Sequence, residues 1–135
     1  YLYAQLEVAD KINDRRLAIW DKYYEGLKEL KDQGKIELQV IPEGCKHNAH
    51  MFFMKAKDLQ ERTELIKYLK ENGIQTVFHY IPLHTAPAGI KYGRFHGEDR
   101  YTTKESERLM RLPMHYALTD EDVECVIEKI KEFYK

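Results

Sequence analysis

The chain has 135 residues, 43% of them hydrophobic, which suits one domain with a core of its own. Its 22 lysines and arginines balance 23 aspartates and glutamates, so no charge excess favours nucleic acid or an anionic membrane as a partner. No apolar stretch approaches the roughly 20 residues that span a bilayer, and no secretory leader pattern precedes the first helix. The only cysteines, Cys45 and Cys125, are far apart in the sequence, and we expect them to be free thiols. Free thiols are typical of cytoplasmic proteins, so we expect a cytoplasmic location.

The first predicted element is a long amphipathic helix. From Leu2 to Leu30 apolar residues recur every three or four positions, which places them on one stripe, and Gly34 is a natural terminator. Arg16 is the one polar residue on that stripe. Because the helical pattern is already under way at Tyr1, we expect the chain to be a piece of a longer polypeptide.

Short strands are predicted between the helices. Alternation over 36–41, a compact apolar run over 51–54 and β-branched residues over 74–78 each favour a strand. Residues 112–114 read as an edge strand, because Pro113 has no backbone N–H to give to a central ladder. A loop of about twenty residues, from Tyr80 to Arg100, is expected where prolines and glycines interrupt regular structure.

Three further helices are predicted from their start signals. Asp58 with Glu61 opens a helix that ends at Asn72-Gly73, with Leu59, Leu65, Ile66 and Leu69 inward. Thr102 with Glu105 opens a short helix to about Arg111, and Thr119 with Asp122 opens the last one. The order α-β-β-α-β-α-β-α predicts an α+β fold with helices packed on one side of a small sheet.

Six histidines are the first candidates for chemistry, but their spacing does not suggest metal binding. A zinc site needs three or four ligands in workable spacing, and the two cysteines are isolated in sequence. Neither cysteine stands in the context of a nucleophile, and Gly89, Gly93 and Gly97 do not lead from a strand into a helix as a phosphate loop would. We therefore predict no metal site and no phosphate loop.

The segment 78–84 (Phe-His-Tyr-Ile-Pro-Leu-His) is the most informative stretch. It follows a predicted strand, so His79, Tyr80 and His84 would project from a rigid support, with Pro82 fixing the backbone between them. Imidazole and phenol groups can hydrogen-bond or stack, which suits a sugar or a nucleobase. The alternative is that Tyr80 and one histidine only satisfy backbone groups at the base of a loop.

Three segments together resemble one enzyme family. Residues 48–52 (Asn-Ala-His-Met-Phe), 78–84, and 95–109 (Phe-His-Gly-Glu-Asp-Arg-Tyr-Thr-Thr-Lys-Glu-Ser-Glu-Arg-Leu) resemble the C-terminal part of DegT/StrS-type sugar aminotransferases. The resemblance runs from about residue 1 to 135. It implies the small C-terminal domain of a fold-type I aminotransferase, with a long first helix and a short, mainly antiparallel sheet packed by helices.

The resemblance also implies an activity for the complete enzyme. Such enzymes use pyridoxal 5'-phosphate (PLP) to move an amino group from glutamate to a dTDP-4-keto-6-deoxyhexose. They are homodimers whose large domain supplies the Schiff-base lysine. Lys104 follows Thr102-Thr103 but lacks the flanking residues of that lysine, so no catalytic residue is expected in this chain, which should be inactive alone.

Substrate contacts are expected from His79, Tyr80 and His84, with His50 and Arg100 as further candidates. A guanidinium at Arg100 could pair with a diphosphate, or equally form a surface ion pair with Glu98 or Asp99. Two other interpretations stay open at this stage. The chain could be a stand-alone ligand-binding or regulatory module, or a dimerisation lobe whose histidines only pack.

Overall fold

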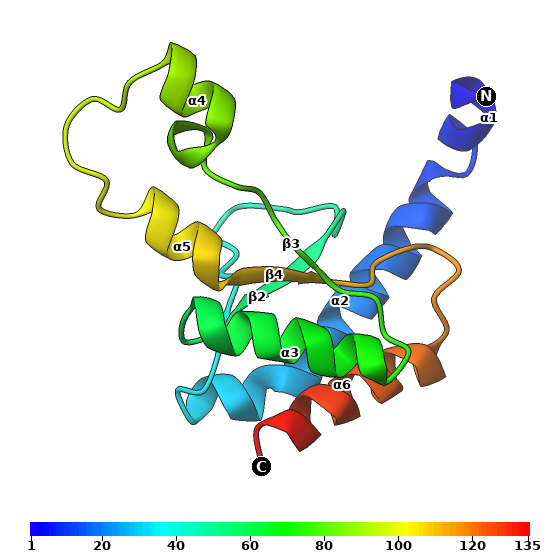
Figure 1. Cartoon of the computed structure of the whole chain (residues 1–135). Coiled ribbons are helices and arrows are strands. Elements are labelled where there is room, and N and C mark those ends of the chain that lie inside the picture. Colours follow the sequence, from blue (N-terminus) through cyan, green and yellow to red (C-terminus); the bar gives the residue numbers. More distant parts are fainter.

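A small antiparallel sheet, with its main helices all on one side, organises the computed structural model, which describes residues 1–135 (Figure 1). Its strands are β1 (Glu37–Leu38), β2 (Phe52–Lys55), β3 (Val77–Phe78) and β4 (Leu109–Leu112). They lie in the order β1-β2-β4-β3, and each neighbouring pair is antiparallel. The predicted α+β class is therefore confirmed, with an entirely antiparallel sheet.

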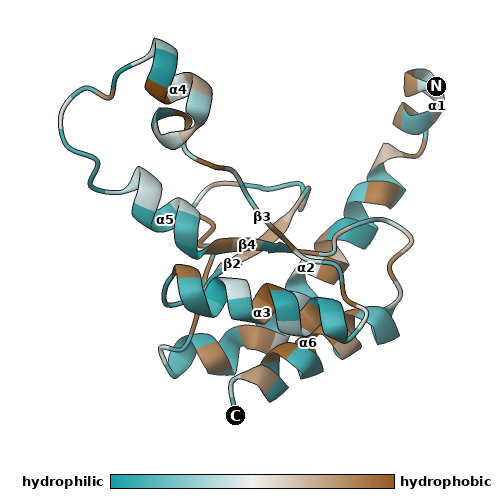
Figure 2. Cartoon of the chain, viewed as in Figure 1, coloured by the Kyte–Doolittle hydropathy of each residue, from teal (hydrophilic) through white to brown (hydrophobic).

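Three helices cover one face of the sheet. They are α2 (Ala9–Asp32), α3 (Leu59–Glu71) and α6 (Asp120–Phe133), and Figure 2 shows the alternating apolar and polar stretches of an amphipathic helix along α3 and α6. As predicted, Asp58 accepts a hydrogen bond from the Glu61 N–H at 2.9 Å. Thr119 and Asp122 form the reciprocal capping box of α6. None of the helices is long and apolar enough to cross a membrane.

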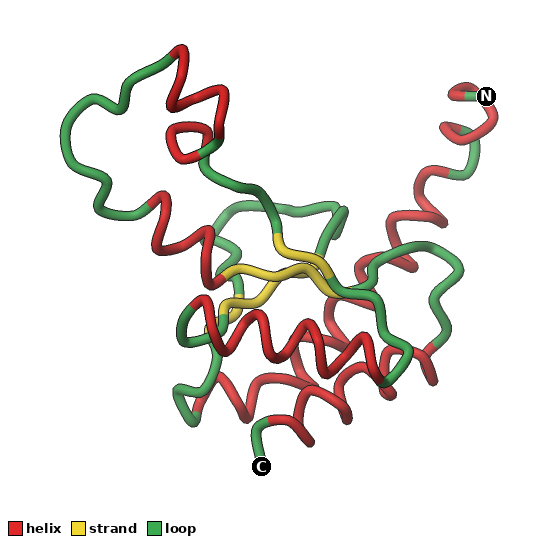
Figure 3. The backbone as a smooth tube through the Cα atoms, in the orientation of Figure 1, coloured by secondary structure: helices red, strands yellow, loops and turns green.

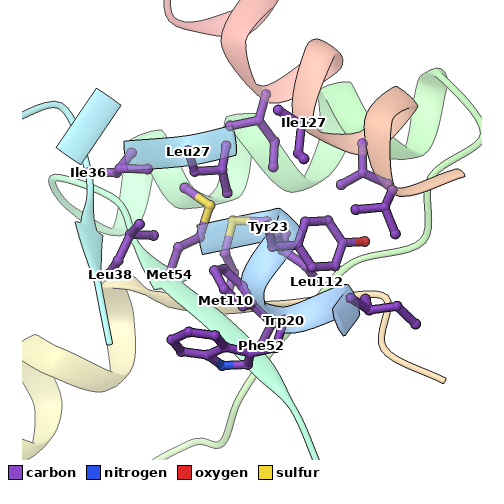
Figure 4. Close-up of a cluster of buried hydrophobic side chains, with 14 of the residues drawn as sticks. Trp20, Tyr23, Leu27, Ile36, Leu38, Phe52, Met54, Met110, Leu112 and Ile127 are labelled. Carbon is purple, nitrogen blue, oxygen red and sulfur yellow. The ribbon is translucent and has the colours of Figure 1, made fainter. Parts of the chain in front are cut away.

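The hydrophobic core lies between these helices and the sheet. Phe52, Met54 and Met110 are fully buried on the helix-facing side of β2 and β4, against Tyr23 and Leu27 of α2 (Figure 4). Because successive strand residues point to opposite faces, the neighbouring residues turn to the other side, where they are only half-buried. We call that second side the open face.

The predicted first helix is wrong as a single element. It divides into α1 (Leu2–Leu6) and α2, with Val8 outside the helical region at φ −120° and ψ 15°. Leu2 and Leu6 are exposed, so no packing in this chain holds the first turn in line with α2. Arg16, the polar residue on the stripe, donates hydrogen bonds to the carbonyls of Ala49 and His50 at 3.2 and 2.6 Å.

The fourth strand also differs from its prediction. It spans Leu109–Leu112 and pairs on both sides, with β2 and with β3, whereas an edge strand over 112–114 was expected. Pro113 lies just past the strand end, so its missing N–H breaks no ladder bond. The preceding helix α5 accordingly ends at Arg108 instead of Arg111.

The long connection between β3 and β4 contains more structure than predicted. A 3₁₀ turn η1 (Leu83–Thr85) and helix α4 (Pro87–Tyr92) precede α5 (Thr102–Arg108), and the tube in Figure 3 shows this segment extending away from the sheet. Proline at the first position of α4 fits the helix start. Thr102 is not the cap of α5; the carboxylate of Asp99 accepts from the N–H groups of Thr102 and Thr103 instead. We call residues 79–108 the excursion.

Leu59 was expected to point inward from α3, but it is exposed. It is the first residue of the helix, where the chain has not yet reached the core. Leu65 and Leu69 are fully buried as predicted, and Ile66 packs at the edge of the core. The inward face of α3 therefore begins one turn later than the apolar pattern indicates.

Candidate functional site

His79 and Tyr80 follow β3 directly and lie beside each other. Their ring centroids are 4.4 Å apart in an edge-to-face arrangement, and Tyr80 is mostly exposed. The Nδ1 of His79 is buried and has no hydrogen-bond partner. Burial lowers the pKa of His79, and the positive charges of Arg111 and His50 lower it further. The end of β3 thus places an imidazole whose neutral form is favoured, and whose Nδ1 is buried without a partner, next to an accessible phenol.

His50 reaches the same neighbourhood from the loop before β2. The preceding Ala49 has φ 47°, in the left-handed region that non-glycine residues rarely adopt. The backbone of His50 is anchored on both sides, because its N–H donates to Asn48 Oδ1 at 3.2 Å and its carbonyl accepts from Arg16 at 2.6 Å. Arg16 therefore holds the loop that carries His50, which explains a cation on the apolar stripe of α2.

Arg111 was not among the predicted site residues. It lies in the centre of β4, opposite Phe53 of β2 and Val77 of β3, and so on the open face. His50, Val77 and Arg111 line one cleft, whose other wall includes Asp122 and Cys125 of α6. The signal in the sequence was a single cation within the apolar strand Leu109–Leu112, but the misplaced strand concealed it.

His84 has a different set of partners. Its Nε2 lies 2.8 Å from Asp99 Oδ2, and its ring is 4.4 Å from that of Phe95. The hydroxyl of Thr103 donates to the same Asp99 oxygen at 2.5 Å. Hydrogen bonds from Thr103, and then from His84, lower the pKa of Asp99. These contacts connect η1 to the start of α5. His84 therefore has a structural role within the excursion.

Arg100 forms the surface ion pair that was weighed against diphosphate binding. Its Nε lies 3.1 Å from Glu98 Oε2, and both side chains are at least 70% exposed. Ion pairs this exposed contribute little to stability, so the guanidinium is not strongly held. No contact of Arg100 involves the residues around His79.

A second hollow lies beside Tyr80, between α3, β3 and α5. The guanidinium of Arg62 stands over the Phe78 ring at 5.4 Å, and its Nε is buried without a partner. The carbonyl of Tyr80 accepts from the Ser106 hydroxyl, which fixes the chain leaving β3. This hollow flanks the exposed phenol with an aromatic floor.

Neither Lys55 nor Lys104 has the surroundings of a lysine that attaches PLP covalently. A lysine that bonds to an aldehyde must present a neutral amine, which burial or a nearby cation favours. Lys55 instead contacts Glu105 at 2.6 Å and Glu37 at 3.2 Å, and these carboxylates raise its pKa. Lys104 is exposed on α5. No group of three or more metal-ligating side chains occurs either.

Comparison with known proteins adds a family. Residues 1–131 match the model of the DegT/DnrJ/EryC1/StrS aminotransferase family. A pleiotropic regulatory protein of Geobacillus stearothermophilus is 34% identical over 73% of this chain and 27% of its own length. A dTDP-3-amino-3,4,6-trideoxy-alpha-D-glucose transaminase of Micromonospora megalomicea is 29% identical over 87% and 31%. A 3-oxo-glucose-6-phosphate:glutamate aminotransferase of Bacillus subtilis is 29% identical over 86% of this chain and 26% of its own length.

Solved structures agree with these relatives. The aminotransferase TlmJ of Streptoalloteichus hindustanus superposes with a TM-score of 0.85 at 26% identity, over 98% of this chain and 34% of TlmJ. NtdA of Bacillus subtilis, solved with the bound cofactor PMP, gives 0.76 at 28% identity, over 90% and 28%. The chain therefore spans about a quarter to a third of the length of the proteins it matches, and a solved neighbour carries the expected type of cofactor.

Proposed function

This chain belongs to the DegT/DnrJ/EryC1/StrS aminotransferase family, and from that premise we propose that it is the small C-terminal domain of a sugar-nucleotide aminotransferase. The complete enzyme would use PLP to transfer an amino group from glutamate to a dTDP-4-keto-6-deoxyhexose. Within the family, the stretch at 95–109 resembles dTDP-4-amino-4,6-dideoxygalactose transaminase, which favours that amino sugar as the product. A dTDP-sugar transaminase and a glutamate-dependent aminotransferase among the relatives support the two substrate classes.

The observation that carries this proposal is the pairing of His79 and Tyr80 at the end of β3. A sugar offers hydroxyls and an apolar ring face, and here a half-buried imidazole lies against an exposed phenol that can stack or hydrogen-bond. His50 approaches from the β2 side and would contact the same ligand. Because both strands belong to one sheet, these side chains are placed before the substrate arrives.

The role of this domain is to bind and orient the substrate. PLP, when bound, supplies the electron sink for the amino transfer. The lowered pKa of His79 favours its neutral form, and the imidazole would exchange a hydrogen bond with a sugar hydroxyl on the side of the ring away from the buried Nδ1. Tyr80 would hold the ring face and help exclude water, and the excursion pinned by His84 and Asp99 would keep Tyr80 in place.

The rest of the assembly follows from the same proposal. The lysine that carries PLP would lie in a large domain of the same polypeptide, since Lys55 is held by two carboxylates and Lys104 is exposed. We propose a homodimer in the cytoplasm, as for the enzymes that the motifs resemble. Apolar side chains exposed on the excursion are available for these contacts. They are Ile81, Leu83, Ile90, Tyr92 and Phe95.

A second candidate is a regulatory or ligand-binding module without catalysis. The observation favouring it is the relative named as a pleiotropic regulatory protein, which is 34% identical. The coding sequence upstream of this chain distinguishes the two functions. A lysine-bearing large domain in frame with this chain supports the enzyme, and a start codon directly before Tyr1 supports the module.

The direct test is an assay of the complete polypeptide with PLP, glutamate and dTDP-4-keto-6-deoxyglucose. We expect an absorbance change of the cofactor on adding glutamate, reversed by the ketosugar, with formation of an amino sugar. Loss of the amino group from glutamate without any response to the ketosugar would reject the acceptor. No cofactor response to either substrate would favour the module.

The division of labour has its own test on the 135-residue chain alone. After incubation with PLP and borohydride reduction, mass spectrometry should show no stoichiometric adduct, because Lys104 is exposed and Lys55 is held by carboxylates. A stoichiometric adduct at Lys104 would contradict the assignment of the cofactor to another domain.

A further inference from the structure

One cation of the open face has no partner in this chain. The open face carries Lys55 and Arg111. Arg108, the last residue of α5, contacts Glu37 of β1. At that end the charges are neutralised: Lys55 contacts Glu37 and Glu105, and Arg108 contacts Glu37 at 2.5 Å. Arg111 lies two residues beyond Leu109, which pairs with Lys55 across the sheet. It forms none of the ion pairs of the chain, and its Nε is buried without a hydrogen-bond partner.

An arginine in that state is unusual, because a half-buried guanidinium normally finds acceptors. Arg15 is paired with Asp120, and Arg16 is satisfied by two carbonyls. Arg62 also has a buried Nε without a partner, but its guanidinium stands over the Phe78 ring at 5.4 Å. A buried donor that lacks a partner costs free energy, so such a group is retained where a ligand supplies the acceptor. What Arg111 lacks within this chain is a hydrogen-bond acceptor.

The surroundings of Arg111 strengthen the preference for an anion. His50 lines the same cleft, and the charge of Arg111 is felt at His79, whose pKa it helps to lower. Asp122 is the carboxylate on the cleft wall, but it is engaged at the start of α6, where it accepts from the Thr119 N–H at 3.1 Å. One fixed positive charge and the imidazole of His50 thus line the cleft, and His79 lies close enough to Arg111 to feel its charge.

We propose that Arg111, assisted by His50 and His79, binds an oxyanion of the substrate and so acts as a positioning and specificity residue for the amino transfer. A guanidinium matches the two oxygens of a carboxylate or a phosphate. The oxyanion is a carboxylate of the amino donor or a phosphate of the nucleotide-sugar. This inference rests on the proposed function, and it moves anion recognition from the exposed Arg100 to the sheet.

Single-turnover kinetics of the complete polypeptide separate the two sources. The cofactor absorbance is followed against glutamate in one arm and against the nucleotide-ketosugar in the other, for the wild type, Arg111→Gln, Arg111→Lys and Arg94→Gln. Arg94 is the matched control, because it is exposed and makes no hydrogen bond or ion pair. Loss of a charged hydrogen bond predicts roughly tenfold to hundredfold weaker apparent binding in one arm for Arg111→Gln, with the limiting rate little changed. Arg111→Lys should fall between, since it keeps the charge and loses the fork.

Weakening confined to glutamate would identify a carboxylate, and weakening confined to the nucleotide-sugar a phosphate. Unchanged binding of both substrates would overturn the proposal, and so would equal weakening of both, since that marks a packing role. If the wild type processes neither substrate, the proposed function fails on its own. Calorimetric titration with inorganic diphosphate and with glutarate then still decides the anion site. At least one anion must bind more weakly to Arg111→Gln than to Arg94→Gln, and identical affinities would overturn the site.

Discussion

The two faces of the sheet differ in burial and in the kind of side chain that they carry. The side toward α2, α3 and α6 is closed, and its central residues Phe52, Met54 and Met110 have no solvent exposure. The open face alternates with them along the same strands and carries half-buried polar groups, among them Arg111 and an imidazole with an unpartnered nitrogen at His79. One set of strands therefore supplies both the stability of the fold and a rigid support for binding groups that the fold itself leaves unsatisfied.

The largest expected effect tests this contrast on adjacent residues. Phe52→Ala removes a ring that contacts Trp20 and Tyr23 at centroid distances of 5.6 and 5.1 Å. Because it leaves a cavity in the core, the free energy of unfolding should fall by about 3–5 kcal/mol in urea denaturation. Phe53→Ala, on the open face, is the matched control and should cost clearly less. Equal losses for the two variants would mean that the open face is also core.

A smaller effect is expected at the excursion. A Cβ on Gly89 would lie 1.6 Å from the carbonyl oxygen of Leu83, so Gly89→Ala must displace α4 from η1. Since the excursion contributes no residue to the core, the global free energy of unfolding should change by less than about 1 kcal/mol. Hydrogen exchange of residues 83–92 should become faster while that of α2 stays slow. A global loss as large as that of Phe52→Ala would contradict this independence.

The excursion should also loosen in acid. Hydrogen bonds from Thr103 and His84 hold the pKa of Asp99 below its ordinary value of 3.8. The carboxylate therefore stabilises the start of α5 above that pH, and this contribution is lost as the pH falls through the lowered pKa. Amide protection at Thr102 and Thr103 should drop over that range in the wild type. In Asp99→Asn the drop should be absent; an unchanged pH profile would mean that other groups control this helix start.

The smallest effect is a titration on the open face. Burial, Arg111 and His50 keep the pKa of His79 below 6.5, so the folded state favours its neutral form. The stability that this preference gives is present above that pH and declines as the pH falls through it. In nuclear magnetic resonance the midpoint of His79 should lie below 6.5 and rise in Arg111→Gln, because one nearby positive charge is removed. If the midpoint of His79 is the same in Arg111→Gln as in the wild type, the charge of Arg111 does not influence His79.

The closed face was largely predictable from sequence, because burial imposes a periodic pattern. The stripe containing Ile19, Leu27 and Leu30, and the capping residues Asp58 and Thr119, marked α2, α3 and α6 correctly. Strand order did not follow from local pattern, since the central place of β4 depends on long-range pairing. Pro113 misled because it ends a strand as readily as it marks an edge.

The open face was predictable only in part. Tyr80 and His79 lie together at the sheet end, as the motif at 78–84 suggested, and His50 joins them through a loop held by Arg16. His84 turned out to bind Asp99 and Arg100 to bind Glu98, contacts that depend on how the excursion folds back. A polar residue in a strand reveals its partners only once its neighbours across the sheet are known, which is why Arg111 was missed.

The central claim is that His79 and Tyr80, at the end of β3, orient the nucleotide-sugar, and single-turnover absorbance of the cofactor in the complete polypeptide tests it most directly. His79→Ala and Tyr80→Ala should slow the ketosugar half-reaction roughly tenfold to a hundredfold, the size expected for one lost hydrogen bond, and spare the glutamate half-reaction. Tyr80→Phe distinguishes the hydroxyl from the ring, because it should be nearly silent if Tyr80 acts by stacking. Equal slowing of both half-reactions would contradict the account, since it would mean that these residues support domain packing and not the sugar.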